Sequence, residues 1–546
     1  MTSLGEQTWF PSGSRTLEGW VHRPDDGRTV GAVVIAGPFA HEALVAYRAI
    51  RVLAVEAARR GFVTVRFSWS GTGDSEPAPA DVDLATAWKE DLTAAVELAR
   101  AASGVDAIDA IGVRFGASVV AAADIPLRTR VLWEPLGGRA FLRMQSSLLK
   151  LHLPAGFPLT TQGVELCGYT LDDAAAAALR TLPDPRSAAT SDGIRLISDD
   201  QEAADELFGR EPQFARVPLS SIENALDALE PGESVALPEW APERELVHLD
   251  GPSGARLRHT FVEVGSSRLP GIYTEPVDAP RAATAALLVP FSNDPKGVDR
   301  ITRATSVRLA RIGVPTLRAD RNGIGDAANP RDLIEVPTFT EAGIDDVAQF
   351  ASWLSERTGS RVTGIGLCSG AWLLARAAAA VPFRQLIMIN NLAWGMSTRH
   401  YTKRLRADAA APQTPGSVAA DATAKVGPLR RLRRGVRAHA PYLIRYRLFS
   451  LFHLDEIAET LLEAVPEQTS ITMLFGTDGD QRSWQAARGP DSVRRLGRQG
   501  RRIEVEYDER ADHALMSEAG LELYLDLLDR EFELKTRPLV SGAATA

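Results

Sequence analysis

The nine residues "GIGLCSGAW" (364–372) place Cys368 between two glycines, after an apolar run and before a stretch of good helix formers. This pattern predicts a sharp turn between a strand and a helix, in which the glycines relieve crowding and the central side chain points out of the sheet. A second stretch, "AIGVRFGAS" (110–118), has the same glycine spacing but carries Arg114 at its centre. We therefore expect two such turns, one with a thiol and one whose central side chain cannot act as a nucleophile.

The rest of the chain also contains two copies of one pattern. "GFVTVRFSWSGTGDS" (61–75) recurs as "GVPTLRADRNGIGDA" (313–327), and "LEGWVHRP" (17–24) recurs as "LPGIYTEP" (269–276). Equivalent positions stay about 252 to 254 residues apart over roughly 120 residues, as expected for an internal repeat. We infer a gene duplication followed by divergence.

Local hydrophobic patterns predict the fold of each copy. Short apolar runs such as "AVVIAG" (32–37) are typical of buried strands, whereas "AIRVLAVEAARRGF" (49–62) has the apolar spacing of a helix. Because strands and helices alternate, each copy is predicted to be an α/β domain with a doubly wound, mostly parallel sheet. We expect the join near residues 249–259 and the following parts: a first domain at 1–250, a second at 256–534 and a flexible tail at 535–546.

Composition argues against several classes of function. The chain has 546 residues, a net charge of −9 and 45% hydrophobic residues, which is typical of a soluble globular protein. Nucleic acid is disfavoured as the main ligand because phosphate contacts need a basic surface. We find no apolar run long enough for a membrane span and no signal-peptide pattern. Only Cys167 and Cys368 are cysteines, which favours a reducing cytoplasm. We expect neither a metal nor a cofactor.

Three motifs carry a resemblance to a known family. "PFAHE" (38–42), "GIGD" (323–326) and the turn "GLCSG" (366–370) together resemble the α/β-hydrolase superfamily, and more narrowly the hydrolases of exosortase-type and peptide-synthetase-type gene clusters. The resemblance extends over about residues 10–530. It implies two tandem α/β-hydrolase domains, each with a cap insertion, and places the second cap at about residues 396–467. It also implies that nucleophile, acid and base follow one another along the chain.

The second copy supplies three suitable groups in that order. The apolar run "ITMLF" (471–475) is followed by Asp478 and Asp480, and His513 comes after a further strand pattern. His513 is predicted to accept the proton of Cys368, while an aspartate fixes the orientation of the imidazole ring. The resemblance favours Asp480 as this acid, with Asp478 as the alternative.

Backbone N–H groups are expected to form the oxyanion hole. We assign the N–H of Ser369 and one near Phe291 or Ser292 to this role, and interpret the Ser369 side chain only as small enough for the turn. Plainer interpretations stay open for the catalytic candidates. Cys368 would otherwise be a buried structural thiol, and His513 a surface histidine.

The first copy lacks two of the three groups. Arg114 cannot attack because its guanidinium stays protonated, and Ser118 lies one helical turn beyond the predicted turn. Two acidic residues, Asp199 and Asp200, follow a strand pattern, but no histidine occurs at 215–229, and His248 comes too late. We interpret this copy as a pseudo-hydrolase that packs against the second copy, shapes its entrance or holds a partner.

A cysteine nucleophile favours acyl-transfer chemistry, because a thiolate attacks thioesters readily. We predict a cysteine-dependent acyl hydrolase or acyltransferase that acts on an ester or thioester through an acyl-enzyme. Lactone opening stays an alternative, since dienelactone hydrolases of the same superfamily also carry a cysteine in this turn. The other alternative is a non-catalytic binding or scaffold protein built from two degenerate hydrolase domains.

A basic stretch at residues 397–447 contrasts with the negative net charge, since only Asp408 and Asp421 are acidic there. One interpretation is a binding site for phosphopantetheine, CoA or an acidic acyl carrier protein. Other interpretations are a solvated helix and a helix that touches anionic lipid. The arginines assigned to anion binding are Arg430, Arg431, Arg433 and Arg434.

Overall fold

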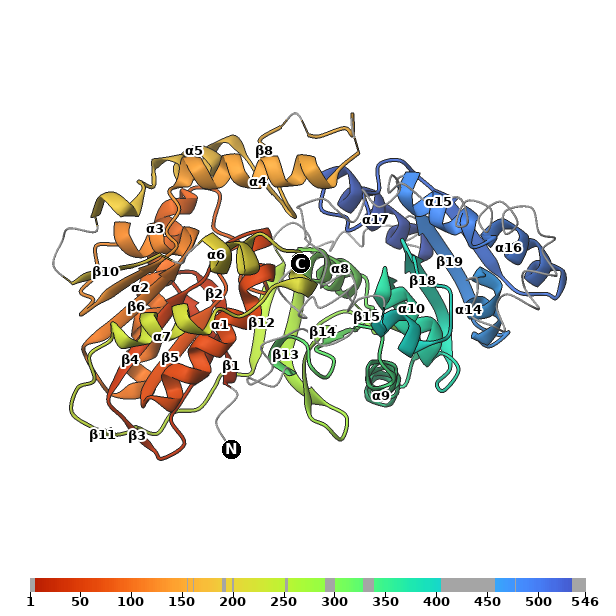
Figure 1. Cartoon of the computed structure of the whole chain (residues 1–546). Helices are drawn as coiled ribbons and strands as arrows, with labels where there is room; N and C mark the ends of the chain where they lie inside the picture. Colours follow the sequence, from red (N-terminus) through yellow and green to blue (C-terminus); the bar gives the residue numbers. More distant parts are fainter. Residues whose placement is uncertain are drawn as a thin grey trace, which may run out of the picture.

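The computed structural model describes residues 5–154, 156–160, 162–188, 193–198, 201–250, 254–289, 300–327, 338–403, 457–476 and 478–532. They form two α/β units that lie side by side, the first in red to yellow and the second in green to blue in Figure 1. No helix within these ranges is long and apolar enough to cross a membrane.

Seven described strands form the main sheet of the first unit, in the order β1-β2-β5-β4-β6-β7-β10. β2 is antiparallel to both of its neighbours, and the strands from β5 to β10 are parallel. The central strand β4 is buried along its whole length, as expected for a parallel sheet covered on both faces. The strands are β1 Glu6–Ser12, β2 Arg15–His22, β4 Gly31–Ala36, β5 Phe62–Phe67, β6 Ile108–Val113, β7 Arg130–Trp133 and β10 Ile194–Ile197.

Helices cover both faces of this sheet. Residues of β4 alternate between two hydrophobic clusters, with Val34 on the side of α2 to α5 and Val33 on the side of α1, α6 and α7. The segment between β7 and β10 forms the layer at the top of the first unit in Figure 1 and contains the short hairpin β8–β9. These elements are α1 His41–Arg59, α2 Leu84–Ser103, α3 Phe115–Ala122, α4 Gly138–His152, β8 Val164–Leu166, β9 Tyr169–Leu171, α5 Asp173–Thr181, α6 Gln201–Phe208 and α7 Leu219–Asp227. The remaining short elements are β3 Arg28–Thr29, β11 Val235–Ala236, η1 Pro185–Ala188 and η2 Pro212–Phe214.

Nine described strands form the second sheet, in the order β12-β13-β14-β16-β15-β17-β18-β19-β20. The strands from β16 to β20 are parallel, while β12, β13 and β14 form an antiparallel edge. The strands are β12 Glu245–Asp250, β13 Ala255–Val264, β14 Leu269–Pro276, β15 Thr284–Val289, β16 Thr316–Ala319, β17 Arg361–Leu367, β18 Phe383–Ile389, β19 Ser470–Phe475 and β20 Ile503–Tyr507.

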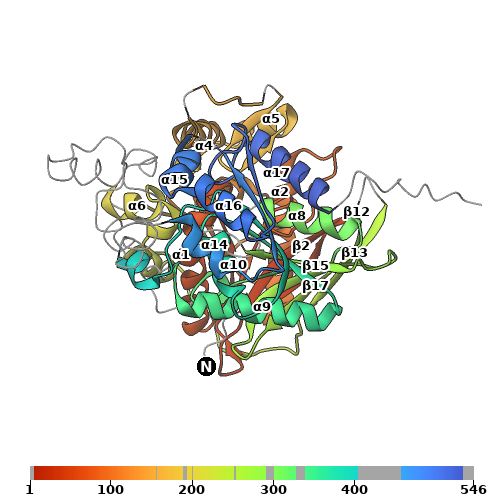
Figure 2. The same ribbon diagram turned by 90° about the vertical axis from the view of Figure 1, so that its right-hand side faces the viewer.

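This sheet is also covered on both faces. Figure 2 views the second unit from its far side and shows α8 and α17 together, with α9 and α10 across the sheet. Trp372 and Trp484 are fully buried in the cluster beneath α9, α10 and α14. The helices are α8 Arg300–Arg311, η3 Gly325–Ala327, α9 Glu341–Thr358, α10 Ser369–Ala377, α14 Ala458–Ala464, α15 Asp478–Ala486, α16 Gly489–Arg498 and α17 Glu518–Glu531.

The two sheets share one order of strands. The run β13-β14-β16-β15-β17-β18-β19 of the second sheet matches the whole of β1-β2-β5-β4-β6-β7-β10, and the second sheet adds β12 and β20 at its edges. This agreement is what a duplicated chain would give.

The two units meet along their first antiparallel strands. Trp9 of β1 stacks on Phe261 of β13, with ring centroids 4.5 Å apart and an interplanar angle of 14°. Their N–H groups donate to neighbouring carbonyl oxygens, that of Trp9 to Glu243 at 2.8 Å and that of Phe261 to Arg244 at 2.9 Å. The segment between the units is thus held by both of them.

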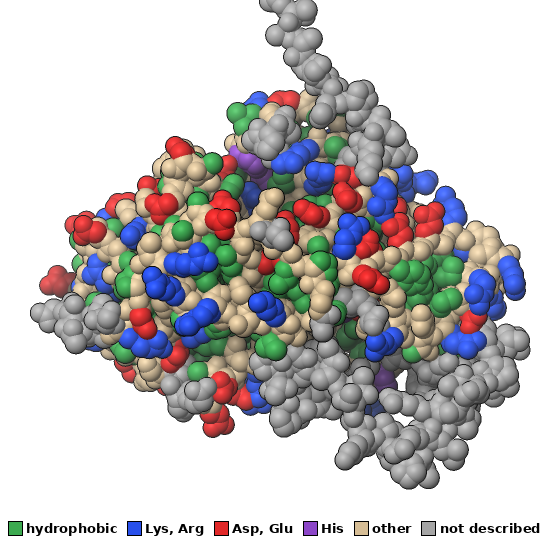
Figure 3. All heavy atoms as spheres, turned by 90° about the horizontal axis from the view of Figure 1, so that it is seen from above, with side chains coloured by type: hydrophobic (Ala, Val, Ile, Leu, Met, Phe, Trp, Pro, Cys, Tyr) green, Lys and Arg blue, Asp and Glu red, His purple; other side chains and the backbone are tan. Residues whose placement is uncertain are grey.

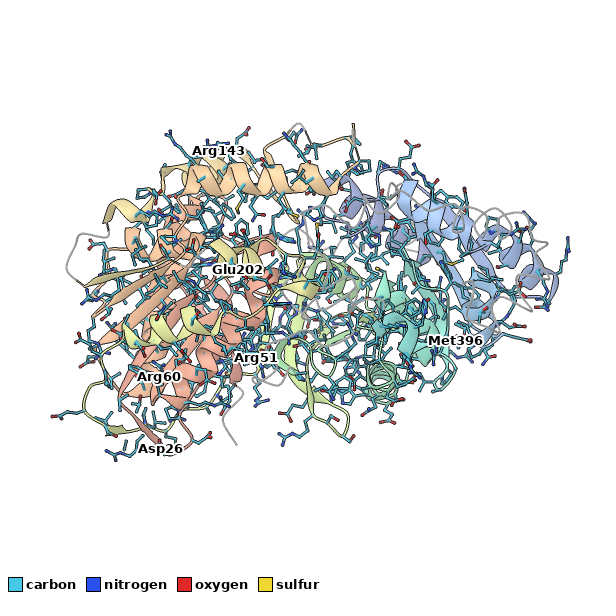
Figure 4. All side chains as sticks on the ribbon, viewed as in Figure 1. Asp26, Arg51, Arg60, Arg143, Glu202 and Met396 are labelled. Carbon is cyan, nitrogen blue, oxygen red and sulfur yellow. The ribbon has the colours of Figure 1, made fainter. Side chains whose placement is uncertain are left out.

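Asp326 of the second unit inserts into a polar pocket of the first. Its carboxylate accepts hydrogen bonds from Trp20 Nε1 at 2.8 Å and Tyr47 Oη at 3.0 Å, and forms an ion pair with Arg66. Arg51 of α1, labelled in Figure 4 where the first unit borders the second, donates to the backbone carbonyl of Asp326 at 3.0 Å. A buried carboxylate with this many donors fixes the relative position of the units.

The predicted α/β fold class is confirmed, with a doubly wound, mostly parallel sheet in each unit. The proposed boundary at residue 250 falls after β12, which already pairs with β13 as the edge of the second sheet. The hairpin β8–β9 was not predicted, because each of its strands has only three residues. Most of the proposed second cap and the tail at 535–546 lie outside the described residues.

Candidate active site

Cys368 occupies the predicted turn between β17 and α10. Its backbone has φ 49° and ψ −112°, a conformation that costs about 1–3 kcal/mol for a residue other than glycine. A Cβ on Gly366 would lie 2.6 Å from the backbone nitrogen of Ala371, so the turn closes only with glycine at this position. The N–H of Cys368 donates to the carbonyl of Ile389 on β18 at 2.8 Å. This hydrogen bond to the neighbouring strand stabilises the strained backbone conformation of the turn. The thiol of Cys368 is partly exposed.

His513 contacts an acid and interacts electrostatically with this thiol. Its Nδ1 is 2.7 Å from Oδ1 of Asp480, a buried residue in the first turn of α15. Burial lowers the pKa of His513, but the Asp480 carboxylate and Cys368 raise it well above its usual value. Because Nδ1 faces Asp480, Nε2 is the ring nitrogen left for the thiol.

Asn390 ties the loops that carry the acid and the base together. It follows β18 with φ 48°, is fully buried, and donates from Nδ2 to the carbonyl oxygens of Asp512 at 3.0 Å and His513 at 2.9 Å. Its Oδ1 accepts from the N–H of Gly476 at 2.8 Å. Our sequence interpretation missed this residue. The available signal was a polar residue at the end of the apolar strand "LIMI".

The remaining predicted site residues are placed only in part. Asp478 is the first residue of α15, and its side chain lies outside the described part of the structure. Ser369 begins α10 with a buried side chain, at a helix end where backbone N–H groups point out of the helix. Phe291 and Ser292 lie outside the described residues, as do Arg430, Arg431, Arg433 and Arg434.

An apolar cleft lies between the two units, beside the turn. The second unit contributes the end of β17 and the loop after His513, and the first unit contributes the start of α1 and the β8–β9 hairpin. The lining includes Ala40, His41, Leu44, Cys167, Gly168, Tyr169, Leu288, Ile301, Ile365, Gly366, Leu367, Leu515, Met516 and Tyr524. The first unit therefore forms one wall of the site in the second.

The hairpin is fastened to the loop that carries His513. The N–H of Gly168 donates to the carbonyl of Met516 at 3.2 Å, and the N–H of Glu518 donates to Oε1 of Glu165 at 2.7 Å. Cys167 Sγ lies 3.2 Å from Sδ of Met516. Burial raises the pKa of the Cys167 thiol, so this second cysteine stays protonated in the wall.

Arg114 fills the equivalent turn of the first unit. Its φ of 54° and ψ of −119° are close to those of Cys368, so the backbone of the turn has been retained. Its Nε donates to Oε1 of Glu42 at 2.7 Å, and its guanidinium lies 4.7 Å from the ring centre of Phe208. Ser118 is fully buried and donates to the carbonyl of Leu136 at 2.7 Å. Neither side chain is available for attack on a substrate.

Charged side chains of both signs are interspersed on the outer surface. Figure 3, seen from above, shows basic and acidic side chains mixed over both units in the described part of this face.

No family model and no curated protein matches the sequence. Solved structures similar to this chain include a dienelactone hydrolase from Anabaena variabilis, with 15% identity and a TM-score of 0.31, covering 51% of this chain and 98% of that one. Another is the alpha/beta hydrolase domain-containing protein 10 from mouse, with 14% identity and a TM-score of 0.28, covering 54% and 99%. A third is an acetyl xylan esterase from Paenibacillus sp. R4, with 14% identity and a TM-score of 0.30, covering 54% and 89%.

Proposed function

We propose that the chain is a cysteine-dependent acyl hydrolase or acyltransferase that acts on an ester or thioester. The observation that carries this proposal is the 2.7 Å contact of His513 Nδ1 with Asp480 Oδ1, with Cys368 close enough to raise the pKa of His513. The three residues follow β17, β19 and β20 along the chain, at the carboxyl ends of these parallel strands. This is the arrangement that activates a weak nucleophile: a base beside it and an acid that orients the base.

The mechanism has two half-reactions. His513 Nε2 takes the proton of Cys368, and the thiolate attacks the acyl carbonyl carbon to form a tetrahedral adduct. The N–H of Ser369 stabilises the negative oxygen. As the adduct collapses, the bond to the leaving oxygen or sulfur breaks, and His513 gives its proton to that atom. Water, an alcohol or an amine then attacks the acyl-enzyme, with His513 again moving the proton, and the thiol is restored.

The cleft indicates an apolar acyl group. Its lining is dominated by aliphatic side chains such as Leu44, Ile365 and Leu515, which favour burial of a hydrocarbon chain over a charged one. A lactone with an apolar ring would also fit this description. The acyl group thus lies between the units, with its carbonyl at the turn of the second unit.

The first unit is proposed to be a pseudo-hydrolase that builds part of the acyl site. Arg114 is held by Glu42, and the cleft-facing hairpin is fastened to the loop of His513. We expect Arg114→Ser to restore no activity in a Cys368→Ala background, because a serine hydroxyl without a neighbouring base stays protonated and weak. Measurable ester hydrolysis by this double variant would show that the first unit has retained a base.

Mass spectrometry of the acyl-enzyme tests the central proposal. The protein is incubated with a series of acyl-CoA thioesters and acyl nitrophenyl esters, and the peptides that contain Cys368 and Cys167 are analysed. We expect an acyl adduct on Cys368, its loss in Cys368→Ala, and its retention in the matched control Cys167→Ala. Turnover that persists in Cys368→Ala would contradict the nucleophile and favour the binding or scaffold alternative.

The donor is proposed to carry a phosphate, as CoA and phosphopantetheine do. Changing Arg430, Arg431, Arg433 and Arg434 together to glutamine should raise KM for a CoA thioester and leave kcat for a small neutral ester unchanged. The reason is that a remote phosphate binds equally in the ground and transition states. The effect should shrink as salt rises, since exposed charges are screened. Equal responses of both substrates would leave these arginines without a role in donor binding.

A further inference from the structure

Two histidines and a glutamate meet in the first unit, at the border of the cleft. His41 begins α1, His152 ends α4, and Glu211 directly precedes η2. One ligand atom from each of the three lies within 4.8 Å of the others, and His152 Nε2 is 3.2 Å from Oε1 of Glu211. None of them takes part in the contacts of Cys368, Asp480 and His513. The mechanism proposed above leaves this cluster unused.

The buried Nε2 atom of His41 indicates that this cluster binds a ligand. The His41 side chain is 7% exposed, and its buried Nε2 has no hydrogen-bond partner among the described residues. A buried polar atom without a partner costs about 1–3 kcal/mol, and such atoms are rare in folded proteins. His41 is one of the three residues whose ligand atoms converge within 4.8 Å, so a ligand bound at that point would contact this buried ring.

The ring of His152 is oriented so that its Nε2 faces Glu211 in the same cluster. Its Nδ1 lies 2.9 Å from the carbonyl oxygen of Leu148, which can only accept a hydrogen bond. Nδ1 therefore carries the hydrogen, and Nε2 is the nitrogen directed at Glu211. A backbone carbonyl that fixes the tautomer in this way is the usual outer partner of a metal-binding histidine.

We propose that His41, His152 and Glu211 bind a transition-metal dication of the zinc class. Two imidazole nitrogens and one carboxylate form a donor set that Zn²⁺ uses in proteins, whereas Mg²⁺ and Ca²⁺ prefer oxygen donors alone. Three protein ligands leave one coordination position open. His41 also lines the cleft, so a metal ion bound by the three residues would lie at its border. Its ligand class is water or an anionic oxygen, such as a carboxylate of a molecule in the cleft.

The proposed metal site lies in the first unit but close to the catalytic residues of the second. His41 lines the same cleft as Ala514, Leu515 and Met516, which directly follow His513. A dication held by the first unit would therefore add positive charge beside the site of the second. This gives the first unit a function of its own, which goes beyond the acyl chemistry proposed above.

Zinc binding is tested in the full chain with Cys368→Ala as the background, so that the thiol cannot bind the metal. We expect isothermal titration with Zn²⁺ to give one site per chain, and Co²⁺ to give the visible absorption of a site with nitrogen ligands. Loss of a residue that only hydrogen-bonds to a metal ligand typically lowers metal affinity by about 10- to 100-fold. Glu211→Gln and His41→Asn each remove a ligand itself, so each should lower the affinity for Zn²⁺ by at least about 100-fold. The control His400→Asn, which changes an exposed histidine elsewhere, should leave the affinity unchanged.

Two results would overturn the proposal. One is the lack of a stoichiometric site in the Cys368→Ala protein, and the other is affinity that survives both Glu211→Gln and His41→Asn. Circular dichroism checks that each variant is folded; should His41→Asn fail to fold, Glu211→Gln decides alone. Since the background variant has no nucleophile, the outcome is independent of whether the acyl chemistry is correct.

Discussion

Arg318 of β16 and Asp74 of the first unit form an ion pair between the two units, with side-chain exposures of 0% and 1%. A second pair runs in the opposite direction, from Arg66 of the first unit to Asp326 of the second. The two arginines occupy equivalent positions of the repeat, and so do the two aspartates. Each unit gives the arginine of one pair and the aspartate of the other, as in an interface between two copies of one chain. The interface between the units thus has approximate twofold symmetry.

Removing one partner of this pair is expected to destabilise the whole chain. Arg318→Met leaves Asp74 charged and buried, so the free energy of unfolding should fall by about 3–5 kcal/mol, and Asp74→Leu should act similarly. The double variant should lose much less than the sum, since no uncompensated charge is left. Urea denaturation of the four proteins measures this coupling.

The exposed pair of Arg60 and Asp227 serves as the control, with side chains 37% and 70% exposed. Arg60→Met should change the free energy of unfolding by no more than about 1 kcal/mol. Additive losses in the Arg318 and Asp74 variants would mean that the two side chains stabilise the interface independently.

The sequence predicted those parts of the molecule that depend on local patterns. Glycine spacing was enough for the turn at Cys368, because the close approach to Ala371 excludes any side chain at Gly366. The order of strands along the chain placed His513 after Asp480, and the structure brings the two into contact. The internal repeat indicated two similar sheets, and the strand orders agree.

Features that depend on contacts between distant segments were not predicted. His41, His152 and Glu211 are far apart in the sequence and show none of the short spacings by which metal ligands are recognised, so we expected no metal. Asn390 resembles any polar residue at a strand end until its two acceptors are known. The hairpin wall of the cleft depends on how the units pack, which the repeat alone does not specify.

The two cysteines should differ strongly in their reaction with iodoacetamide. Cys368 is partly exposed beside His513, whereas Cys167 is buried and burial raises its pKa. Because the thiolate is the reactive form, we expect Cys368 to be alkylated at least about 100-fold faster at neutral pH. Peptide mass spectrometry over time gives both rates in one sample. Comparable rates, or faster labelling of Cys167, would contradict the assignment of the reactive thiol.

Asp480→Asn should lower kcat by roughly 10²–10⁴-fold, because the ring of His513 loses the partner that orients it. Asp480 is the strongest of the effects that raise the pKa of His513. The alkaline limb of the pH profile, where the imidazolium loses the proton needed by the leaving group, should therefore move to lower pH. Asp478→Asn is the matched control, and it should have little effect on kcat or on the position of the alkaline limb of the pH profile. A larger loss of kcat in Asp478→Asn than in Asp480→Asn would instead assign Asp478 as the acid that orients His513.

The same contact should make stability depend on pH. Because the pKa of His513 is raised in the folded state, the folded protein holds this proton more tightly than the unfolded chain. The stabilisation is fully present below the unfolded pKa of about 6.5 and is lost as pH rises through the folded pKa. The difference in the free energy of unfolding between the natural protein and Asp480→Asn should therefore shrink as pH rises. Urea denaturation at a series of pH values checks the sign.

Asn390 is expected to position the catalytic loop rather than to touch the substrate. Asn390→Ala removes two hydrogen bonds to the loop of His513 and one to Gly476, so the free energy of unfolding should fall by about 2–4 kcal/mol. kcat should fall while KM changes little, because the acyl cleft itself is unchanged. Asn391→Ala is the control: Asn391 is equally buried, but its Nδ2 donates to the carbonyl of Ala393, away from His513. It should lower stability and leave kcat intact, so a matching loss of kcat in both variants would reduce the role of Asn390 to general packing.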